Sequence, residues 1–199
     1  HQGVVEWVDP TQLRSAGWGI IFPAKMDTGC LEALKTRLAP LLEWRAGQAG
    51  RYYRLYAGGE GYRPNDTAAS FLQRYGARAA DPANPEYVPY YLLLIGSPEE
   101  IPFEFQYQLD VQYAVGRLDF GDDLDAYRHY AESVVAAEAA DFQQDPRAVF
   151  FAVQHPSDAA TAASSQYLVQ PLVNRLRKKT EGSAWQVNCI AAPQSTKPA

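Results

Sequence analysis

A cysteine and a histidine near the ends of two consecutive predicted strands are the residues best suited to covalent chemistry. His155 follows the apolar run at residues 148–153, and Cys189 lies within the strand predicted at residues 185–190, with a helix predicted between them. A cysteine hydrolase needs an imidazole beside the thiol to remove its proton. However, Pro156 follows His155 where a glycine turn would better open a site, and Cys189 shares an apolar alternation typical of packed side chains. We therefore expect both residues to be structural.

Metal ligands are scarce in the sequence. None of the 3 histidines is paired with another at the spacings that zinc sites use, and we expect His129 to lie on the surface of a helix. Asp122, Asp123 and Asp125 gather where a helix is predicted to begin. Carboxylates there stabilise the positive end of the helix dipole, which favours capping over metal binding. We predict no metal and no cofactor.

The residues that follow predicted strands are the remaining candidates, because sites in open α/β sheets lie at the carboxyl ends of the strands. Residues 96–100 (GSPEE) follow the most apolar run of the chain, at residues 90–95. They do not form a phosphate-binding loop, since GxxxxGK[ST] and GxGxxG are both absent, as is the GxSxG nucleophile motif. The sequence therefore assigns no catalytic, cofactor-binding or metal-binding residue.

Charge and composition exclude several partners. The chain has 199 residues and a net charge of −5, whereas nucleic-acid-binding proteins usually carry a basic stripe. Its one basic run, Arg175 to Lys179, ends a predicted helix, where cations complement the dipole. No apolar run approaches the roughly 20 residues of a membrane helix. The 2 cysteines form no disulfide framework and are expected to be buried thiols. No signal peptide is evident. We therefore expect a cytoplasmic protein without nucleic-acid or membrane partners.

The predicted elements alternate between strands and helices. Short apolar runs bounded by turn residues predict buried strands at residues 17–23, 90–95, 112–118, 148–153 and 185–190. Apolar residues at helical spacing predict helices from residue 28, from residue 66 with Asp66 as its cap, and over residues 123–141 and 159–179. In the last of these helices we expect five apolar side chains to point inward, those of Tyr167, Leu168, Leu172, Val173 and Leu176. Pro40 should kink or end the first helix. Residues 51–56 fit a strand or a helix end. This order predicts an α/β fold with a mostly parallel sheet and helices on both faces.

Residues 88–138 carry a motif of known type. The strand at residues 90–95 is followed by G-S-x-x-x-I-P at residues 96–102, a link containing Asp110 and Tyr113, the strand ending V-G-R-L at residues 115–118, and a Y-x-x-Y helix. This order resembles the caspase-like cysteine peptidases of the gingipain type. The chain departs from that family at Ser97, where aspartate is usual, and in its shorter link. From the residues themselves, we expect Arg117 to anchor its strand end rather than face a cleft.

The resemblance implies an incomplete three-layer α/β/α sandwich with a caspase-like sheet. It implies an N-terminal α/β portion at residues 1–85 and the front of the peptidase domain at residues 86–199. The family's catalytic histidine lies in a His-Gly pair, followed after a helix by a strand-end cysteine. This sequence contains no His-Gly, so the resemblance places the Cys–His dyad beyond Ala199 and disfavours His155 and Cys189.

Three functions remain open. The chain is expected to be a fragment of a cysteine endopeptidase, whose partners would be the remaining C-terminal part, or a second chain carrying it, and a protein substrate. The second hypothesis is an inactive peptidase-like module that binds or scaffolds. The third is an α/β domain that binds a small ligand at its strand ends.

Overall fold

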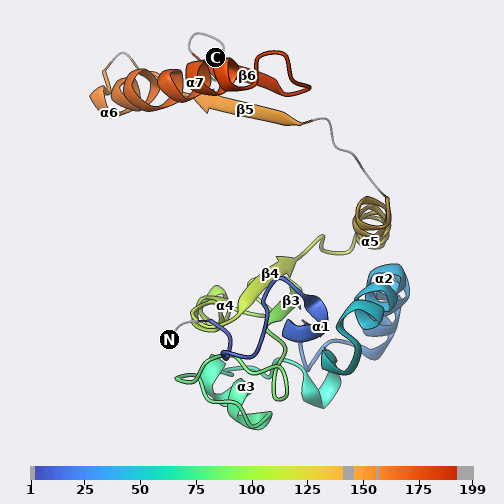
Figure 1. Ribbon diagram of the computed structural model, residues 1–199. Helices are drawn as coiled ribbons and strands as arrows, with labels where there is room; N and C mark the ends of the chain where they lie inside the picture. Colours follow the sequence, from blue (N-terminus) through green and yellow to red (C-terminus); the bar gives the residue numbers. More distant parts are fainter. Residues whose placement is uncertain (1–2, 141–145, 156, 192–199) are drawn as a thin grey trace. The chain divides into compact units, whose positions relative to one another are not determined.

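The computed structural model of the chain describes residues 3–140, 146–155 and 157–191 (Figure 1). It divides into two compact units, His1–Ala140 and Asp141–Ala199, called here the first and the second unit. The domain division predicted at residue 85 falls between two strands of a single sheet in the first unit. No helix in the described ranges combines the length and the apolar character needed to cross a membrane.

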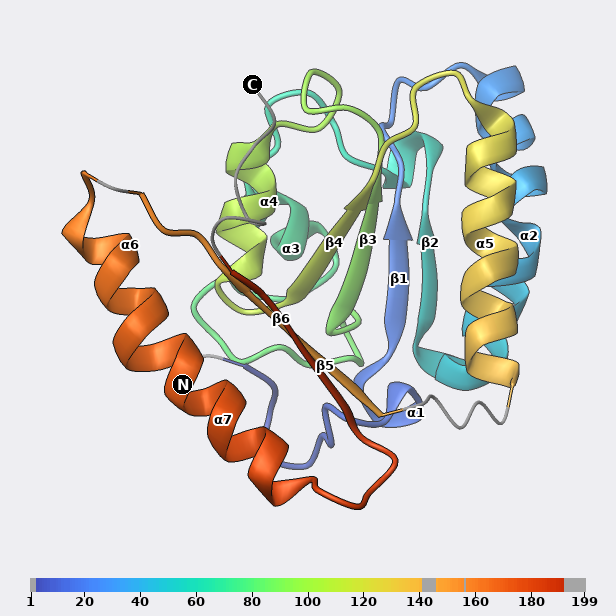
Figure 2. The same ribbon diagram turned by 90° about the horizontal axis from the view of Figure 1, so that it is seen from above.

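The first unit is built on a four-stranded sheet in which all strands are parallel. Its strands are β1 (Trp18–Ile21), β2 (Tyr53–Tyr56), β3 (Tyr91–Ile95) and β4 (Ala114–Leu118), arranged in the order β2-β1-β3-β4 (Figure 2). The predicted strands at residues 17–23, 90–95 and 112–118 are confirmed, and the ambiguous segment at residues 51–56 is a strand after a 3₁₀ turn (Gly50–Tyr52).

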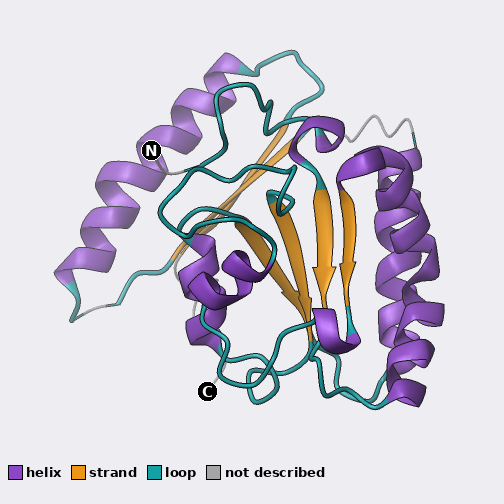
Figure 3. Ribbon diagram, turned by 90° about the horizontal axis from the view of Figure 1, so that it is seen from below, coloured by secondary structure: helices purple, strands orange, loops and turns teal. Residues whose placement is uncertain are grey.

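β3 is the centre of the first unit's core. Leu92 and Leu94 face one apolar cluster, whereas Leu93 and Ile95 face a second cluster on the other side of the sheet. All four side chains are buried, which confirms the prediction of a strand covered on both faces. Helices lie on both faces of the four strands (Figure 3).

Two long helices, α2 (Thr28–Ala49) and α5 (Leu124–Ala139), cover one face. Asp27 caps α2 by accepting hydrogen bonds from the amides of Gly29 and Cys30. The helix does not end at Pro40, where we predicted a kink or an end. Proline removes one helical hydrogen bond, but buried leucines on both sides of it hold the helix to the sheet.

Two shorter helices, α3 (Ala68–Arg74) and α4 (Phe103–Asp110), cover the other face. The predicted cap of α3 is wrong by one residue: Thr67 is the N-cap, and its hydroxyl accepts a hydrogen bond from the Ser70 amide at 3.1 Å. Asp66 instead accepts from the Arg74 guanidinium at 2.9 Å. No helix was expected at α4, which buries only Phe105 and Leu109.

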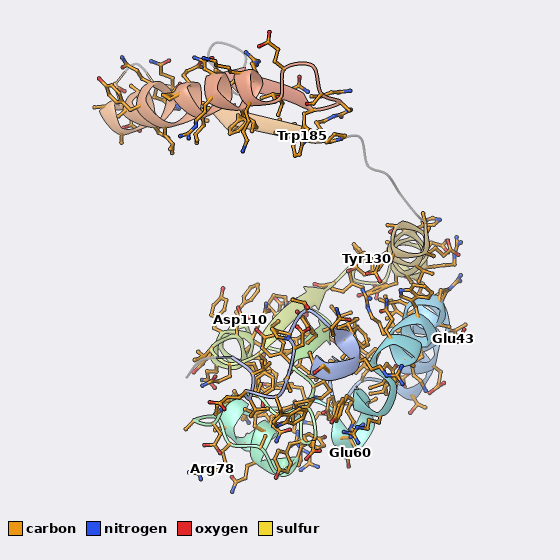
Figure 4. All side chains as sticks on the ribbon, in the orientation of Figure 1. Glu43, Glu60, Arg78, Asp110, Tyr130 and Trp185 are labelled. Carbon is orange, nitrogen blue, oxygen red and sulfur yellow. The ribbon has the colours of Figure 1, made fainter. Side chains whose placement is uncertain are left out.

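Three short elements complete the first unit. α1 (Leu13–Ala16) precedes β1, a 3₁₀ turn (Gly50–Tyr52) precedes β2, and a second 3₁₀ turn (Gly58–Glu60) follows β2. Glu60, labelled in Figure 4, ends that second turn, so the chain passes from β2 directly into the loop that precedes α3.

The second unit is a βαβ arrangement of two parallel strands and one helical segment. β5 (Arg147–Ala152) pairs with β6 (Gln186–Ala191). The helical segment between them comprises α6 (Ala159–Ala163), a π-helical stretch (Ser164–Val169) and α7 (Gln170–Lys179). The predicted strands at residues 148–153 and 185–190 and the helix at residues 159–179 are therefore confirmed.

Burial in the second unit differs from the prediction. β5 is not buried on both faces, because the side chains of Val149 and Phe151 are 56% and 61% exposed. Tyr167, Leu168 and Leu172 were expected to point inward, but they are also exposed. The physical reason is that the sheet of the second unit is narrow. Two strands cover only part of the helical segment that packs on them.

Glu138 joins the ends of α5 and α2. Its carboxylate accepts two hydrogen bonds from the Arg45 guanidinium, each at 2.7 Å, and one from the Trp44 indole at 2.8 Å. The Arg45 hydrogen bonds, followed by those of Trp44 and Gln48, lower the pKa of Glu138 from 4.5 to about 2, although burial opposes the shift.

Replacing Glu138 with glutamine should destabilise the protein at neutral pH but not in strong acid. Because the folded state lowers this pKa, the ionised carboxylate adds stability above pH 4.5, and that stability is lost as the pH falls towards 2. Urea unfolding of wild type and Glu138→Gln at several pH values measures the difference. Glu132→Gln, which removes an exposed pair with Arg128, should cost less than about 0.5 kcal/mol. A wild-type advantage that stays constant down to pH 2 would contradict this account.

Gly61 leaves no room for a side chain. A Cβ atom there would overlap the carbonyl oxygen of Phe22, whereas a Cβ atom at Gly59 would meet nothing within 4 Å. Gly61→Ala should therefore lower the free energy of unfolding by about 1–3 kcal/mol, the usual cost of overpacking. Gly59→Ala should change it by less than about 0.5 kcal/mol. Chemical denaturation of both variants tests the expectation, which fails if their losses are equal.

Candidate functional site

The strand order creates a crevice between β1 and β3. From β1 the chain moves outward to β2, and from β3 it moves the opposite way to β4, so the connections diverge between these two neighbours. In open α/β sheets, ligands bind outside the carboxyl ends of the strands at such a switch point. A cavity of about 420 Å³ lies there, lined by residues that follow β1, β2 and β3. We call it the β1/β3 cleft.

The segment after β1 forms the first wall of the cleft. Pro23, Lys25 and Met26 line it. The backbone is fixed by hydrogen bonds from the Ala24 amide to the Tyr62 carbonyl at 2.7 Å and from the Met26 amide to the Pro23 carbonyl at 3.1 Å. Lys25 is exposed, and within the described part of the chain its ammonium group has no ion pair or hydrogen bond.

The loop between β2 and α3 forms the second wall, through Tyr62, Pro64 and Asn65. The Tyr62 side chain is only 4% exposed, and burial, followed by the nearby Asp66 carboxylate, raises the pKa of its phenol, which stays neutral. Asn65 has a φ of 68°, a left-handed conformation that asparagine tolerates better than most residues. The ion pair of Asp66 with Arg74, at 2.9 Å, holds the end of this loop.

The turn after β3 forms the third wall, through Glu99, Glu100 and Pro102. The Ser97 amide donates to Oε2 of Glu100 at 2.9 Å, so this carboxylate closes the turn. Hydrogen bonds to its own backbone amide and to the Ser97 side chain lower the pKa of Glu99. Both side chains are exposed and carry negative charge into the cleft at neutral pH.

Arg117 on β4 ties this third wall to the sheet. Its guanidinium donates to the carbonyl of Gly96 at 2.7 Å, to the carbonyl of Ile101 at 2.6 Å and to Oε1 of Gln106 at 3.0 Å. It also lies 5.2 Å from the centre of the Phe103 ring. Burial lowers its pKa, but an arginine guanidinium stays charged. The expectation that Arg117 anchors its strand end is confirmed.

The cleft has the composition of a binding site rather than of a nucleophilic one. Its lining combines an ammonium group from one strand end, two carboxylates from the next, and apolar surface from three prolines, a methionine and a tyrosine. None of the lining residues is Cys, His, Ser or Thr. The arrangement can therefore bind a ligand with both charges, and its lining contains no hydroxyl or thiol of Ser, Thr or Cys.

The structure does not bring His155 and Cys189 together as a catalytic pair. Cys189 lies inside β6 opposite Phe150, and its thiol lies 3.8 Å from the Gln170 side-chain nitrogen. His155 lies beyond the end of β5, is exposed, and donates its backbone amide to the Thr161 hydroxyl at 3.1 Å. A cysteine in the middle of a strand does not have the strand-end position that the chemistry would need.

Other charged candidates have structural positions. Asp123 caps α5 by accepting from the Ala126 amide, and the other two aspartates of that cluster lie beside it at the helix start. The basic run ends α7, as expected. Asp110, labelled in Figure 4, accepts from the Val115 amide at 3.3 Å. In the described ranges, no three His, Cys, Asp or Glu side chains are grouped as a metal site requires.

Two further expectations concern single side chains. His129 is exposed on α5, as expected. Cys30 was expected to be a buried thiol, but it is exposed in the first turn of α2, and neither cysteine is in a disulfide. The apolar residues around Cys30 face the sheet, and Cys30 itself falls on the outer side of the helix.

Sequence reasoning pointed to residues 96–100 as a strand-end segment but not to Lys25, Tyr62 or Asn65. These three residues follow other strands, and only the strand order brings them to the same cavity. The class of protein that results is a parallel α/β protein with a polar cleft at the carboxyl edge of its sheet. No family model, curated protein or solved structure matches the chain.

Arg117→Lys should destabilise the first unit even though it keeps the positive charge. An ammonium group cannot donate to three acceptors arranged around a planar guanidinium, so buried carbonyl groups lose their partners, at a cost of about 1–3 kcal/mol. Arg128→Lys is the matched control, because Arg128 forms only exposed pairs on α5 and should change stability by less than about 0.5 kcal/mol. Urea unfolding followed by tryptophan fluorescence measures both, and equal losses would refute the anchoring role.

Proposed function

We propose that this chain is the front, non-catalytic part of a caspase-like cysteine endopeptidase of the gingipain type. In this proposal the described sheet is part of a three-layer, caspase-like α/β/α sandwich. The catalytic His-Gly histidine and the strand-end cysteine belong to polypeptide that follows Ala199, either in the same chain or in an associated one. The chain itself supplies scaffold and no catalytic residue.

The observation that carries the proposal is the hydrogen bonding between the two halves of the motif that resembles the peptidase family. Arg117, from V-G-R-L, donates to the carbonyl groups of Gly96 and Ile101, which belong to G-S-x-x-x-I-P. The spacing that resembles the peptidase family therefore corresponds to one physical contact between neighbouring strands. A chance match of short apolar strings would not require such a contact.

The open surfaces of the second unit add support. Parallel strands are normally covered on both faces, yet Val149, Phe151 and Ile190 are exposed on one face of the β5–β6 pair. Further polypeptide that packs on this face would complete the layer. This fits a peptidase domain of which the chain is the front part, with the remaining C-terminal part, or a second chain carrying it, as the partner.

The proposed chemistry is acyl transfer to a cysteine outside this chain. Its thiolate would attack a peptide carbonyl of a protein substrate, breaking the C–N bond and forming a thioester. The imidazole would protonate the leaving amine, and water would then hydrolyse the thioester and release the free thiol. Backbone amides would stabilise the oxyanion. The two free thiols of this chain suit a reducing compartment, so we propose a cytoplasmic location.

The alternative is a peptidase-like module that binds or scaffolds without catalysis. The β1/β3 cleft favours it, because the cleft has charged and apolar walls but no cysteine or histidine. The two proposals differ in whether a reactive cysteine accompanies the chain.

Intact mass and peptide mapping of the natively produced protein should reveal polypeptide beyond this sequence. We expect either a mass above 22.1 kDa or a tightly associated second chain, containing His-Gly and a cysteine that an electrophilic peptide probe labels. Cys30→Ser and Cys189→Ser should leave that labelling unchanged, because the reactive thiol lies elsewhere. A mass of 22.1 kDa with no associated chain and no labelling would overturn the peptidase proposal and leave the binding module.

A further inference from the structure

We propose that the β1/β3 cleft binds a small zwitterion, namely an amino acid or a dipeptide with free ends and an apolar side chain. In this arrangement Lys25 pairs with the ligand carboxylate, and Glu99 and Glu100 pair with its ammonium group. The inference concerns residues that lie wholly within the first unit, so it does not depend on a catalytic pair elsewhere.

The charges of the cleft are opposite, near one another in the fold, and not paired together. Lys25 follows β1 and the two glutamates follow its neighbour β3, so one cavity receives both signs. No ion pair within 4.0 Å joins Lys25 to either glutamate. Both carboxylates also have partners within the turn: Glu100 accepts from the Ser97 amide, and Glu99 accepts from its own amide and from the Ser97 side chain. A ligand with both charges would satisfy all these groups at once.

The charge balance argues against ligands of one sign. Two carboxylates beside one ammonium group would repel a phosphate or a dicarboxylate, and Lys25 would repel a simple cation. A neutral sugar would leave the charged groups without partners. A zwitterion avoids each of these costs, because it carries one charged group for each of the two walls.

Size and apolar lining set the rest of the ligand. A cavity of about 420 Å³ is near the lower end of the range of ligand sites, roughly 300–1,000 Å³, which fits a small ligand. Met26, Pro64 and Pro102 offer apolar surface to a side chain, and methionine adapts readily to different shapes. The ligand therefore carries an apolar side chain between its two charged ends.

The walls are held in place before any ligand arrives. Arg117 fixes the turn after β3, and the Asp66–Arg74 ion pair fixes the loop that carries Tyr62 and Asn65. Backbone hydrogen bonds fix the segment around Lys25. Such preorganisation reduces the entropy lost on binding, so a few exposed charge pairs can give measurable affinity.

The test uses the whole chain and the dipeptide Leu-Leu, titrated by calorimetry and followed by amide NMR shifts. We expect saturable binding in the millimolar range or tighter, with shifts centred on residues of the three walls. N-acetyl-Leu-Leu and Leu-Leu-amide should each bind about fivefold more weakly, the change expected when one solvent-accessible charge pair is lost. Free leucine tests whether the single amino acid suffices.

Variants assign the two charges. Lys25→Gln should weaken binding of Leu-Leu about fivefold but leave binding of Leu-Leu-amide unchanged. Glu99→Gln should likewise weaken binding of Leu-Leu about fivefold but leave binding of N-acetyl-Leu-Leu unchanged. Lys35→Gln and Glu132→Gln are the controls, because both residues are on helices outside the cleft. The proposal is overturned if neither leucine nor Leu-Leu binds saturably, if the blocked dipeptides bind as well as the free one, or if the controls weaken binding equally.

Discussion

β3 must be covered on both faces, and most of the first unit follows from that requirement. Its side chains point alternately into two apolar clusters, so helices have to lie on both sides of the sheet. Connections between parallel strands are right-handed, so the direction in which the chain moves decides which face its helix covers. The step from β1 to β2 places α2 on one face, and the steps from β2 to β3 and on to β4 place α3 and α4 on the other. The β1/β3 cleft is the consequence of that reversal.

Arg117 shows how a partly buried charge can organise a cleft that it does not line. Its guanidinium donates to the carbonyl groups of Gly96 and Ile101 and to Gln106, so three of its five N–H groups are engaged within the protein. The desolvation that lowers its pKa is opposed only in part by the nearby carboxylates of Asp119, Glu100 and Glu99. Its effect on the cleft is positional, because it holds the turn from which Glu99 and Glu100 extend. The cleft-lining charges on this wall, Glu99 and Glu100, are thus negative, although Arg117, which supports the wall, is positive.

Elements with a strong local signal could be predicted from the sequence, and those that depend on distant partners could not. The YLLLI run correctly predicted β3, because a solvent-exposed strand does not keep apolar residues at every position. α4 was missed because only Phe105 and Leu109 are buried, and polar residues fill the rest of the helix. Lys25 and Asn65 had no signal, since their meeting depends on strand order. Tyr167 and Leu168 were expected to point inward but are exposed, because helical spacing does not reveal how wide the facing sheet is.

The narrow sheet of the second unit gives it a small core, and a small core contributes little to the free energy of folding. Among its described residues only Ala152, Ser165 and Val173 are buried, and all three have small or medium side chains. Burying a valine side chain stabilises by about 1.5–3 kcal/mol, whereas ordering each residue of the backbone costs roughly 1–2 kcal/mol. With so small a core, the unit depends mainly on the packing of its helical segment against the two strands. Val149, Phe151, Tyr167 and Leu172 are exposed, so their apolar surface adds little to the core of this unit.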